Sequence, residues 1–340
     1  MAGQGAAAMN ARPRHQRGVA LLVALLVVAL AVILVAALLD RGELALARTR
    51  NALRAQQAEA YARGVEIYAA RILQDPSSET GADTHASAWA VPLPPQPVPG
   101  GVVGATMRDL NGCFNLNNLS TQAVDPARWR AVFVNLLAAL GLDPGLATPI
   151  AAWLDAGGAG GDDAAWYLAL PVPYRPRGGL FMHVSELRLV RGISGEVYAR
   201  LAPQVCALPP GTRLNLDTAS VPVLQALGPP QSPLSVAQAQ QLWQDGNADW
   251  QGSLSDLRLR WLQRTIVLDT ALDDSMVGTT SRYFLARSDI VLDDVPFAYY
   301  SLIERAGDGV RVLERSRGSD DALVAPAPVA AGGPPAAPAD

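Results

Sequence analysis

The stretch that decides the fold is VALLVALLVVALAVILVAALL, residues 19–39, which is followed by Asp40 and Arg41. It contains 21 residues and no charged side chain. As an α-helix it would be about 32 Å long, which matches a bilayer core of about 30 Å. The sequence therefore predicts one membrane span. A single span excludes a simple cytosolic protein, and it also excludes a channel or transporter, which needs several.

The composition narrows the function further. The chain has 340 residues and a net charge of −4, and its 27 basic residues are all arginines that form no cluster. This argues against a general nucleic-acid binder, whose affinity comes mostly from neutralising phosphates. Cys113 and Cys206 form no CxxC pair and lie near no histidine, which argues against zinc. If the bulk of the chain lies outside the cytoplasm, the two could form one disulfide.

A short basic leader precedes the apolar run and contains Arg12, Arg14, Arg17 and Gly18. Basic residues on one flank keep that flank cytoplasmic, so the chain from Asp40 onward should be exported. An ordinary signal peptide has an apolar region of about 7–15 residues with a small-residue cleavage site after it. Here the run is longer and the small residue stands before it. An uncleaved signal anchor is the alternative.

The helix is expected to continue beyond the membrane. Between Asp40 and Asp75 there is no proline, and good helix formers dominate. The pattern predicts one helix to about Leu73, about 80 Å in all, which Asp75 and Pro76 would end. Its expected apolar stripe consists of Leu46, Leu53, Tyr61, Val65, Tyr68 and Ile72.

A basic leader ending in glycine, an apolar helix and an amphipathic continuation together resemble a type IV prepilin or pseudopilin. The resemblance implies that a prepilin peptidase cuts between Gly18 and Val19 and methylates the new N-terminus. Most members carry glutamate at the fifth mature position, where this chain has Val23. In the family that glutamate pairs with the terminal amine of the subunit above, so a subunit without it suits the tip of a filament. The alternative is that Val23 is an ordinary apolar residue of a plain anchor.

The exported part shows strand patterns at both of its ends. Residues 81–101 are rich in proline and glycine and are expected to form a linker or loop. The predicted strands are 102–110, 282–292, 297–305 and 309–315, the last two joined by a hairpin. Between them, residues 126–141 predict a core-facing helix, and shorter helices are expected at 146–154, 185–191, 195–202, 219–227, 235–243 and 255–263. The simplest fold is an α/β domain with a helical insertion.

Four segments occur in a characteristic order: GCFNLNNL at 112–119, WLDAGGAGGDDAAWY at 153–167, HVSELRLVRG at 183–192 and LPPGTRLNLDTASVPVLQAL at 208–227. Together with the N-terminus they resemble the general secretion pathway protein K family, the large minor pseudopilin of type II secretion systems. The resemblance spans roughly residues 17–315. The missing glutamate at Val23 agrees with it.

The resemblance implies an α+β pseudopilin fold, in which a long N-terminal helix packs on a small antiparallel β-sheet and a large all-α domain is inserted between strands. The expected boundaries are a leader at 1–18, the N-terminal helix at 19–75, an α/β domain at 76–110 and 280–316, and the insertion at 111–279. The tail at 317–340 is rich in alanine, proline and glycine and is expected to be disordered.

The resemblance also implies a function without catalysis. The protein would be a single-pass inner-membrane protein with a cytoplasmic N-terminus and a periplasmic bulk, at the tip of the pseudopilus. Its implied partners are minor pseudopilins I, J and H, major pseudopilin G, the prepilin peptidase, the inner-membrane assembly platform, and secreted substrates or the secretin. The tip complex would start pseudopilus assembly and support export of folded proteins.

Asp155, Asp162 and Asp163 flank the glycine-rich loop GGAGG, and carboxylates on a flexible loop suit calcium. Members of the family can bind calcium near a similar segment. This chain keeps these acids but has Gly157 where the family usually has another aspartate, so it has one carboxylate ligand fewer. The alternative is a solvated acidic loop.

Cys113 and Cys206 each lie beside a family segment, which favours a disulfide over two buried thiols. Asn115, Asn117 and Asn118 are expected to be structural, and Glu186 is expected to stabilise a helix N-terminus. Residues 214–228 also resemble half of a helix-hairpin-helix unit, so the alternative function is a membrane-anchored DNA-binding or uptake protein. Prolines after Gly228 and the lack of basic residues weigh against it.

Overall fold

A computed structural model describes residues 16–74, 81–154, 162–246, 254–307 and 309–318, without the side chains of 16–18, 162, 163, 246 and 254. The predicted disordered tail lies outside the described residues from 319 onward. The chain divides into two compact units, Met1–Gln57 and Ala58–Asp340. Each is described by itself.

The first unit is the N-terminal part of helix α1, Gln16–Leu73, which confirms the predicted helix and its end. Each large apolar side chain between Val19 and Leu39 is 53–69% exposed. A helix bonds its own backbone groups and presents apolar side chains outward, which suits lipid. Within the described residues, α1 is the one helix that is long and apolar enough to cross a membrane.

In the second unit, the last turns of α1 pack on the β-sheet through an alanine-rich stripe. Its buried residues are Ala58, Ala62, Val65, Ala69 and Leu73, at steps of three or four. The predicted stripe was half right: Val65 is buried and Tyr61 and Ile72 are half-buried against the same clusters, whereas Leu46, Leu53 and Tyr68 are exposed. Small alanine side chains let the helix backbone approach the sheet closely, and Tyr61 and Ile72 pack at the border of the buried stripe.

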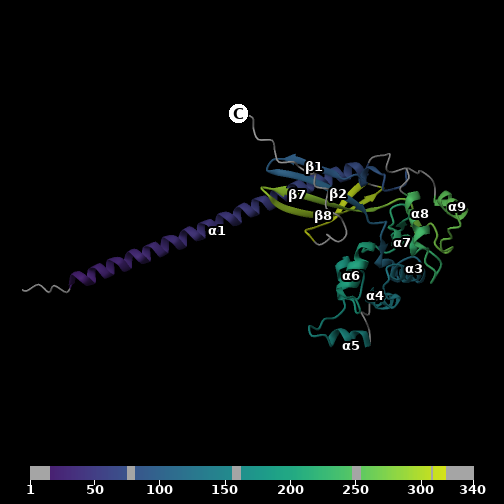
Figure 1. The fold of residues 1–340 in the computed structure, drawn as a ribbon, viewed down its shortest axis with the longest axis horizontal. Coiled ribbons are helices and arrows are strands. Elements are labelled where there is room, and N and C mark those ends of the chain that lie inside the picture. Colours follow the sequence, from purple (N-terminus) through teal and green to yellow (C-terminus); the bar gives the residue numbers. More distant parts are fainter. Residues whose placement is uncertain (1–15, 75–80, 155–161, 247–253, 308, 319–340) are drawn as a thin grey trace, which may run out of the picture. The chain divides into compact units, whose positions relative to one another are not determined.

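The sheet has five strands in the order β1-β2-β7-β8-β9, and every neighbouring pair is antiparallel. Figure 1 shows β1, β2, β7 and β8 side by side. The bounds are Leu93–Val98 for β1, Gly101–Asp109 for β2, Tyr283–Leu292 for β7, Val295–Ala306 for β8 and Gly309–Ser316 for β9. The four predicted strands are confirmed as β2, β7, β8 and β9.

The first strand, β1, corrects the expectation of a linker at 81–101. This proline-rich segment forms the edge of the sheet, and its register with β2 shifts between Leu93 and Gln96. Proline has no N–H to donate, but an edge strand needs only one bonded side, so proline is tolerated there. The prolines thus mark an edge strand rather than the absence of a strand.

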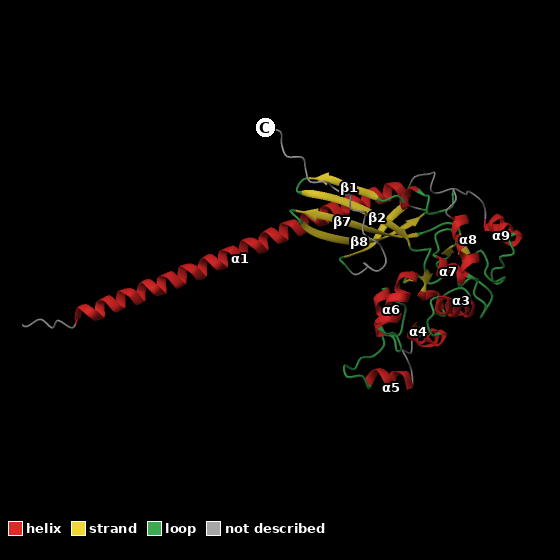
Figure 2. Cartoon of the chain, in the orientation of Figure 1, coloured by secondary structure: helices red, strands yellow, loops and turns green. Residues whose placement is uncertain are grey.

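A large insertion connects β2 to β7, close to the predicted boundaries of 111 and 279. Figure 2 shows its helices in red, gathered beside the yellow strands of the sheet. The α-helices are α3 Pro126–Ala139, α4 Ala147–Leu154, α5 Asp162–Leu168, α6 Gly195–Leu201, α7 Val221–Gln225, α8 Val236–Gly246 and α9 Leu254–Gln263. Its 3₁₀-helices are η2 Leu116–Leu119, η3 Pro144–Leu146, η4 Val184–Leu189 and η5 Ala202–Gln204, and a further one, η1 Ala88–Ala90, precedes β1.

Two pairs of very short strands also lie in the insertion. Strand β3, Phe114–Asn115, pairs in parallel with β4, Val205–Cys206. Strand β5, Leu214–Asn215, pairs in parallel with β6, Val277–Gly278. The sequence analysis missed all four, because two-residue strands have no periodic pattern. It also predicted a helix at 185–191, where the structure has the 3₁₀-helix η4.

The insertion has its own hydrophobic core, centred on α3. Trp129 and Phe133 of this helix pack on Phe114 with ring centroids 5.8 and 5.0 Å apart. Trp153 is buried in the same cluster, and Trp166 packs on its border, so the tryptophans belong to the core as expected. The core explains how this block can be a folded layer distinct from the sheet.

Candidate functional site

The N-terminal candidates all lie in the first turns of α1. Gly18 and Val19 are helical, and Val23 is 53% exposed on the apolar surface of the first unit. No described part of the chain tests whether the bond between Gly18 and Val19 is cut. Cleavage there and methylation of Val19 remain predictions.

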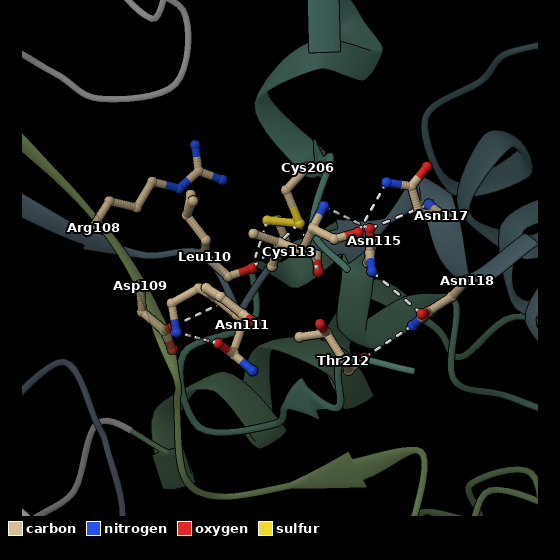
Figure 3. Close-up of a disulfide and its surroundings, with 12 residues drawn as sticks. Arg108, Asp109, Leu110, Asn111, Cys113, Asn115, Asn117, Asn118, Cys206 and Thr212 are labelled. Atoms are coloured by element: carbon tan, nitrogen blue, oxygen red, sulfur yellow. Dashed lines mark hydrogen bonds between the residues drawn. A yellow bond between two sulfur atoms is a disulfide. The ribbon is translucent and has the colours of Figure 1, made fainter. Parts of the chain in front are cut away.

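A disulfide lies where the insertion meets the sheet. Cys113 and Cys206 are joined, their Cα atoms are 5.9 Å apart and both side chains are buried (Figure 3). The parallel pairing of β3 with β4 brings the two segments together across 93 residues of sequence. Closing a loop of that length restricts the unfolded chain and stabilises the fold by about 4.6 kcal/mol in the entropy model.

The asparagines of the 112–119 segment are structural links. Asn117 donates to the carbonyls of Phe181 and Leu208 at 2.9 and 2.8 Å and accepts from the Phe181 N–H at 2.8 Å. Asn115 accepts from the Leu208 N–H at 3.0 Å. Figure 3 shows Asn118 bonded to Thr212, at 2.9 Å. Each side chain joins backbone segments about 60–95 residues apart, which supports the predicted structural role.

A buried carboxylate at the end of β2 ties the insertion to the sheet. Asp109 accepts from the Ser281 hydroxyl at 2.6 Å, from the Asn215 amide at 3.2 Å and from the Thr218 hydroxyl. Burial raises the pKa of Asp109 to about 6, although the hydrogen bonds from Ser281 and Thr218 oppose the shift. Asn215 and Thr218 belong to the insertion, whereas Ser281 stands just before β7.

A second buried carboxylate, Asp83, is part of the same cluster. It accepts from the Ser281 N–H at 2.7 Å and from the Trp89 indole at 3.2 Å, and it forms an ion pair with Arg305. Burial raises the pKa of Asp83, and the Arg305 guanidinium opposes that shift. Through these hydrogen bonds the two acids join the segment before β1, the end of β2, the insertion and the segment before β7.

Asp217 differs from these two acids because neither of its carboxylate oxygens has a hydrogen-bond partner among the described residues. The residue is 2% exposed, and burial raises its pKa to about 7. Arg260 lowers the pKa again in part, and Asp83 adds to the rise. Sequence reasoning missed this acid because it saw Asp217 only as a charge that disfavours DNA.

The matches with known proteins concern this same region. A family model described as type II secretion system protein K matches residues 112–210, which include both cysteines and the asparagines. The type II secretion system protein K of Pectobacterium carotovorum is 34% identical over 89% of this chain and 97% of its own length. That of Pseudomonas aeruginosa is 34% identical over 90% of this chain and 94% of its own length.

The chain belongs to the type II secretion system protein K family. It is also similar to a protein in the crystal structure of the GspK-GspI-GspJ complex from enterotoxigenic Escherichia coli, with 27% identity and a TM-score of 0.60. That similarity covers 80% of this chain and 99% of the other. The predicted pseudopilin fold with a helical insertion is therefore confirmed. The family is a structural component of a secretion machine.

The predicted calcium ligands of this family member fall largely outside the description. Asp155 lies outside the described residues, and for Asp162 and Asp163 only the backbone, at the start of α5, is described. The flanks of the loop do meet, because Trp153 contacts Tyr167 with ring centroids 6.0 Å apart. The Trp153 indole N–H is buried and has no hydrogen-bond partner among the described residues. The contact of Trp153 with Tyr167 thus brings the two described ends of this segment together.

Two further predicted features have structural roles in this chain. The Glu186 carboxylate accepts from the His183 N–H at 3.1 Å in a capping box at the start of η4. In the segment that resembles a helix-hairpin-helix unit, Leu216, Val223 and Leu227 are buried in the insertion core. The Gly228 N–H donates to the Gln225 carbonyl, so it is not turned outward as phosphate binding would require.

Proposed function

We propose that this protein is the minor pseudopilin at the tip of the type II secretion pseudopilus. There it assembles with minor pseudopilins I and J, and with H, above the major pseudopilin G. The complex starts pseudopilus assembly and supports export of folded periplasmic proteins across the outer membrane. Its N-terminus lies on the cytoplasmic side of the inner membrane and its bulk in the periplasm.

The observation that carries this proposal is the likeness to the GspK structure, because that protein was solved together with GspI and GspJ. The likeness extends over 99% of the solved chain, so the surfaces that meet partners in that complex have counterparts in this fold. A shared fold at 27% identity supports a shared mode of assembly.

The place at the tip is supported by Val23. A carboxylate inside a bilayer is costly unless it is paired, and the pairing in relatives uses the amine of the subunit above. Residues 19–39 contain no acid at all, so this subunit has no group with which to bind another terminal amine. Nothing then requires a subunit above it.

The proposal also includes the route to the filament. The prepilin peptidase cuts between Gly18 and Val19 and methylates Val19, and the inner-membrane assembly platform then takes up the mature helix. The periplasmic domain at the tip is placed to meet secreted substrates or the secretin. Calcium, held by Asp155, Asp162 and Asp163, would order the loop between α4 and α5 by cross-linking its carboxylates.

Co-purification tests the partners. The full chain with a C-terminal affinity tag is expressed with the I, J and H pseudopilins of the same system and extracted in mild detergent. We expect I and J to remain bound through gel filtration. Recovery of the tagged chain alone, with I and J expressed and soluble, would contradict the proposed complex.

Labelling of assembled filaments tests the position. With the tag marked by gold, the label is expected at one end of each overproduced pseudopilus. Labels spread along the filament would contradict a tip position. The matched variant Val23→Glu restores the pairing group, so it is expected to allow label within the filament as well.

A further inference from the structure

A polar groove of about 760 Å³ lies where the insertion meets the sheet. Its described lining includes three arginines, Arg213, Arg282 and Arg305, and contains no acidic residue. The arginines come from three separate places in the sequence: the segment before β5, the residue before β7 and the end of β8. The volume is within the range of about 300–1,000 Å³ that is usual for ligand sites, and it is far larger than a single small ion needs.

Two of the guanidinium groups are fixed by the fold. Arg305 pairs with Asp83, donates to the Ser281 carbonyl at 2.7 Å and stacks over Phe284. Arg282 pairs with Glu304 at 2.5 Å and stacks over Tyr283. Arginine side chains that the fold already holds in place lose little conformational entropy when a ligand binds.

Arg213 differs from the other two because its acceptors are neutral. It donates to the Asp274 carbonyl and to the Thr280 hydroxyl, both at 3.3 Å. Among the described residues no carboxylate lies within ion-pair distance of Arg213, and the Asp274 carboxylate pairs instead with Arg258. Two weak, neutral contacts leave most of the hydrogen-bonding capacity of this guanidinium available.

The described lining of the groove carries three guanidinium groups, two of which pair with carboxylates. Glu304 is shared between Arg282 and Arg311, and Asp83 pairs with Arg305. Among the described lining residues, Arg213 is the guanidinium that forms no ion pair. A carboxylate that enters the groove can therefore pair with it directly.

Two asparagine side chains hold the segment that carries Arg213 in place. Asn111 donates to the Arg213 carbonyl at 2.8 Å, and Asn118 donates to the Thr212 carbonyl at 2.9 Å and accepts from the Gly211 N–H at 2.9 Å. Figure 3 shows Asn118 pointing toward Thr212 below the disulfide. Gly211 has a φ of 78°, which L side chains rarely adopt, so the turn depends on a glycine.

We propose that this groove binds an acidic peptide segment of another protein, with Arg213 pairing with a carboxylate side chain. A guanidinium fork matches the two oxygens of a carboxylate and binds them in a bidentate way. The remaining lining, which includes Pro209, Pro210, Tyr283 and the Thr280 hydroxyl, offers both apolar and polar contacts to a peptide. This site is additional to the filament role and does not depend on it.

The test uses the purified full chain in detergent and a fluorescein-labelled peptide of alternating glutamate and glycine. Fluorescence anisotropy should show saturable binding that weakens as salt increases. The same peptide with glutamine in place of glutamate should not bind. Arg213→Gln should weaken binding by about tenfold or more, because a charge-assisted pair is lost.

Two matched variants make the result specific. Arg130, on α3, is exposed and lies outside the groove, so Arg130→Gln should bind as the wild type does. Arg213→Lys keeps the charge but loses the fork, and it should bind with an affinity between those of the wild type and Arg213→Gln. Thermal unfolding of each variant checks that the fold is intact.

The proposal is overturned if the wild type shows no saturable binding, if the glutamine peptide binds equally well, or if folded Arg213→Gln binds like the wild type. Equal losses in the Arg213→Gln and Arg130→Gln variants would also overturn it, since they would indicate attraction by overall charge only.

Discussion

Glu66 of α1 and Arg315 of β9 form a two-pronged ion pair, with Nε–Oε1 and Nη2–Oε2 distances of 2.7 and 2.5 Å. The Ser301 hydroxyl of β8 donates to the same carboxylate at 2.6 Å. Glu66 is 7% exposed. One side chain thus ties the C-terminal part of α1 to two strands of the sheet. It does so beside an alanine stripe that supplies little apolar area.

Replacing Glu66 by glutamine should loosen this attachment. The variant keeps the shape but loses the charge, so the contacts of Arg315 and Ser301 become ordinary hydrogen bonds. We expect the free energy of unfolding to fall by about 1–3 kcal/mol, measured by urea unfolding of the full chain in detergent.

Glu59→Gln is the matched control, because Glu59 also lies on α1 and faces Arg315, at 3.7 Å, but is half-exposed. Its loss should be smaller than that of Glu66→Gln. Equal stability of Glu66→Gln and the wild type would show that the alanine stripe alone holds the helix.

Asn117 is the most connected of the asparagines beside the disulfide, and Asn117→Ala should destabilise the insertion strongly. The change removes three hydrogen bonds and leaves two backbone groups of Phe181 and one of Leu208 buried without them. The expected cost is about 3 kcal/mol or more. Hydrogen exchange should show the loss in 112–119 and 180–208, whereas exposed Asn51→Ala on α1 should leave both segments protected. Unchanged protection in Asn117→Ala would contradict the linking role.

Asp217 predicts a specific dependence of stability on pH. Burial raises its pKa to about 7, from an ordinary value near 3.8. The folded state therefore holds the proton more tightly than the unfolded chain does, and the free energy of unfolding falls as the pH rises from about 4 to about 7. Asp109, whose pKa burial raises to about 6, acts in the same direction.

Asp217→Asn should remove part of this dependence. At about pH 3 the variant and the wild type should be nearly equal, because the wild-type carboxyl is protonated in both the folded and the unfolded state there. At pH 8 the variant should be more stable by about 2–4 kcal/mol, since it has no charge to bury. Urea unfolding at the two pH values measures the difference. A difference between variant and wild type that is the same at both values would exclude Asp217 as the cause.

Calcium should stabilise the full chain if the acidic loop binds it. At a concentration about 100 times the Kd, binding adds about 2.7 kcal/mol, which corresponds to a rise in Tm of several degrees over a sample with EGTA. Asp163→Asn should abolish the rise, whereas Asp143→Asn, which alters an acid at the start of η3, should retain it. Equal Tm values with calcium and with EGTA in the wild type would contradict a calcium site.

Much of the fold could be predicted from the sequence, because the spacing of apolar residues in a long segment indicates whether it is a helix or a strand. The span at 19–39, helix α3 and strands β7 and β8 each contain enough regularly spaced apolar residues to identify them. The edge strand β1 could not be predicted in this way, since its prolines also mark loops. The burial of Ala58, Ala62 and Ala69 escaped for a related reason: alanine is a good helix former on any face.

The candidate site was predictable only in part. Cys113 and Cys206 could be paired because the chain has only two cysteines. The junction of Asp83, Asp109 and Ser281 joins residues that are 26 to 198 apart in sequence, and no local pattern connects them. The groove beside Arg213 escaped for the same reason, since its three arginines meet only through the pairing of the strands.

The most direct test of the account is the intact mass of the protein isolated from membranes of cells that contain the prepilin peptidase. The account predicts the mass of residues 19–340 plus one methyl group on Val19, and it predicts that Gly18→Val leaves the leader attached. A wild-type chain that keeps residues 1–18 under these conditions would contradict the pseudopilin assignment of the N-terminus and favour a plain membrane anchor.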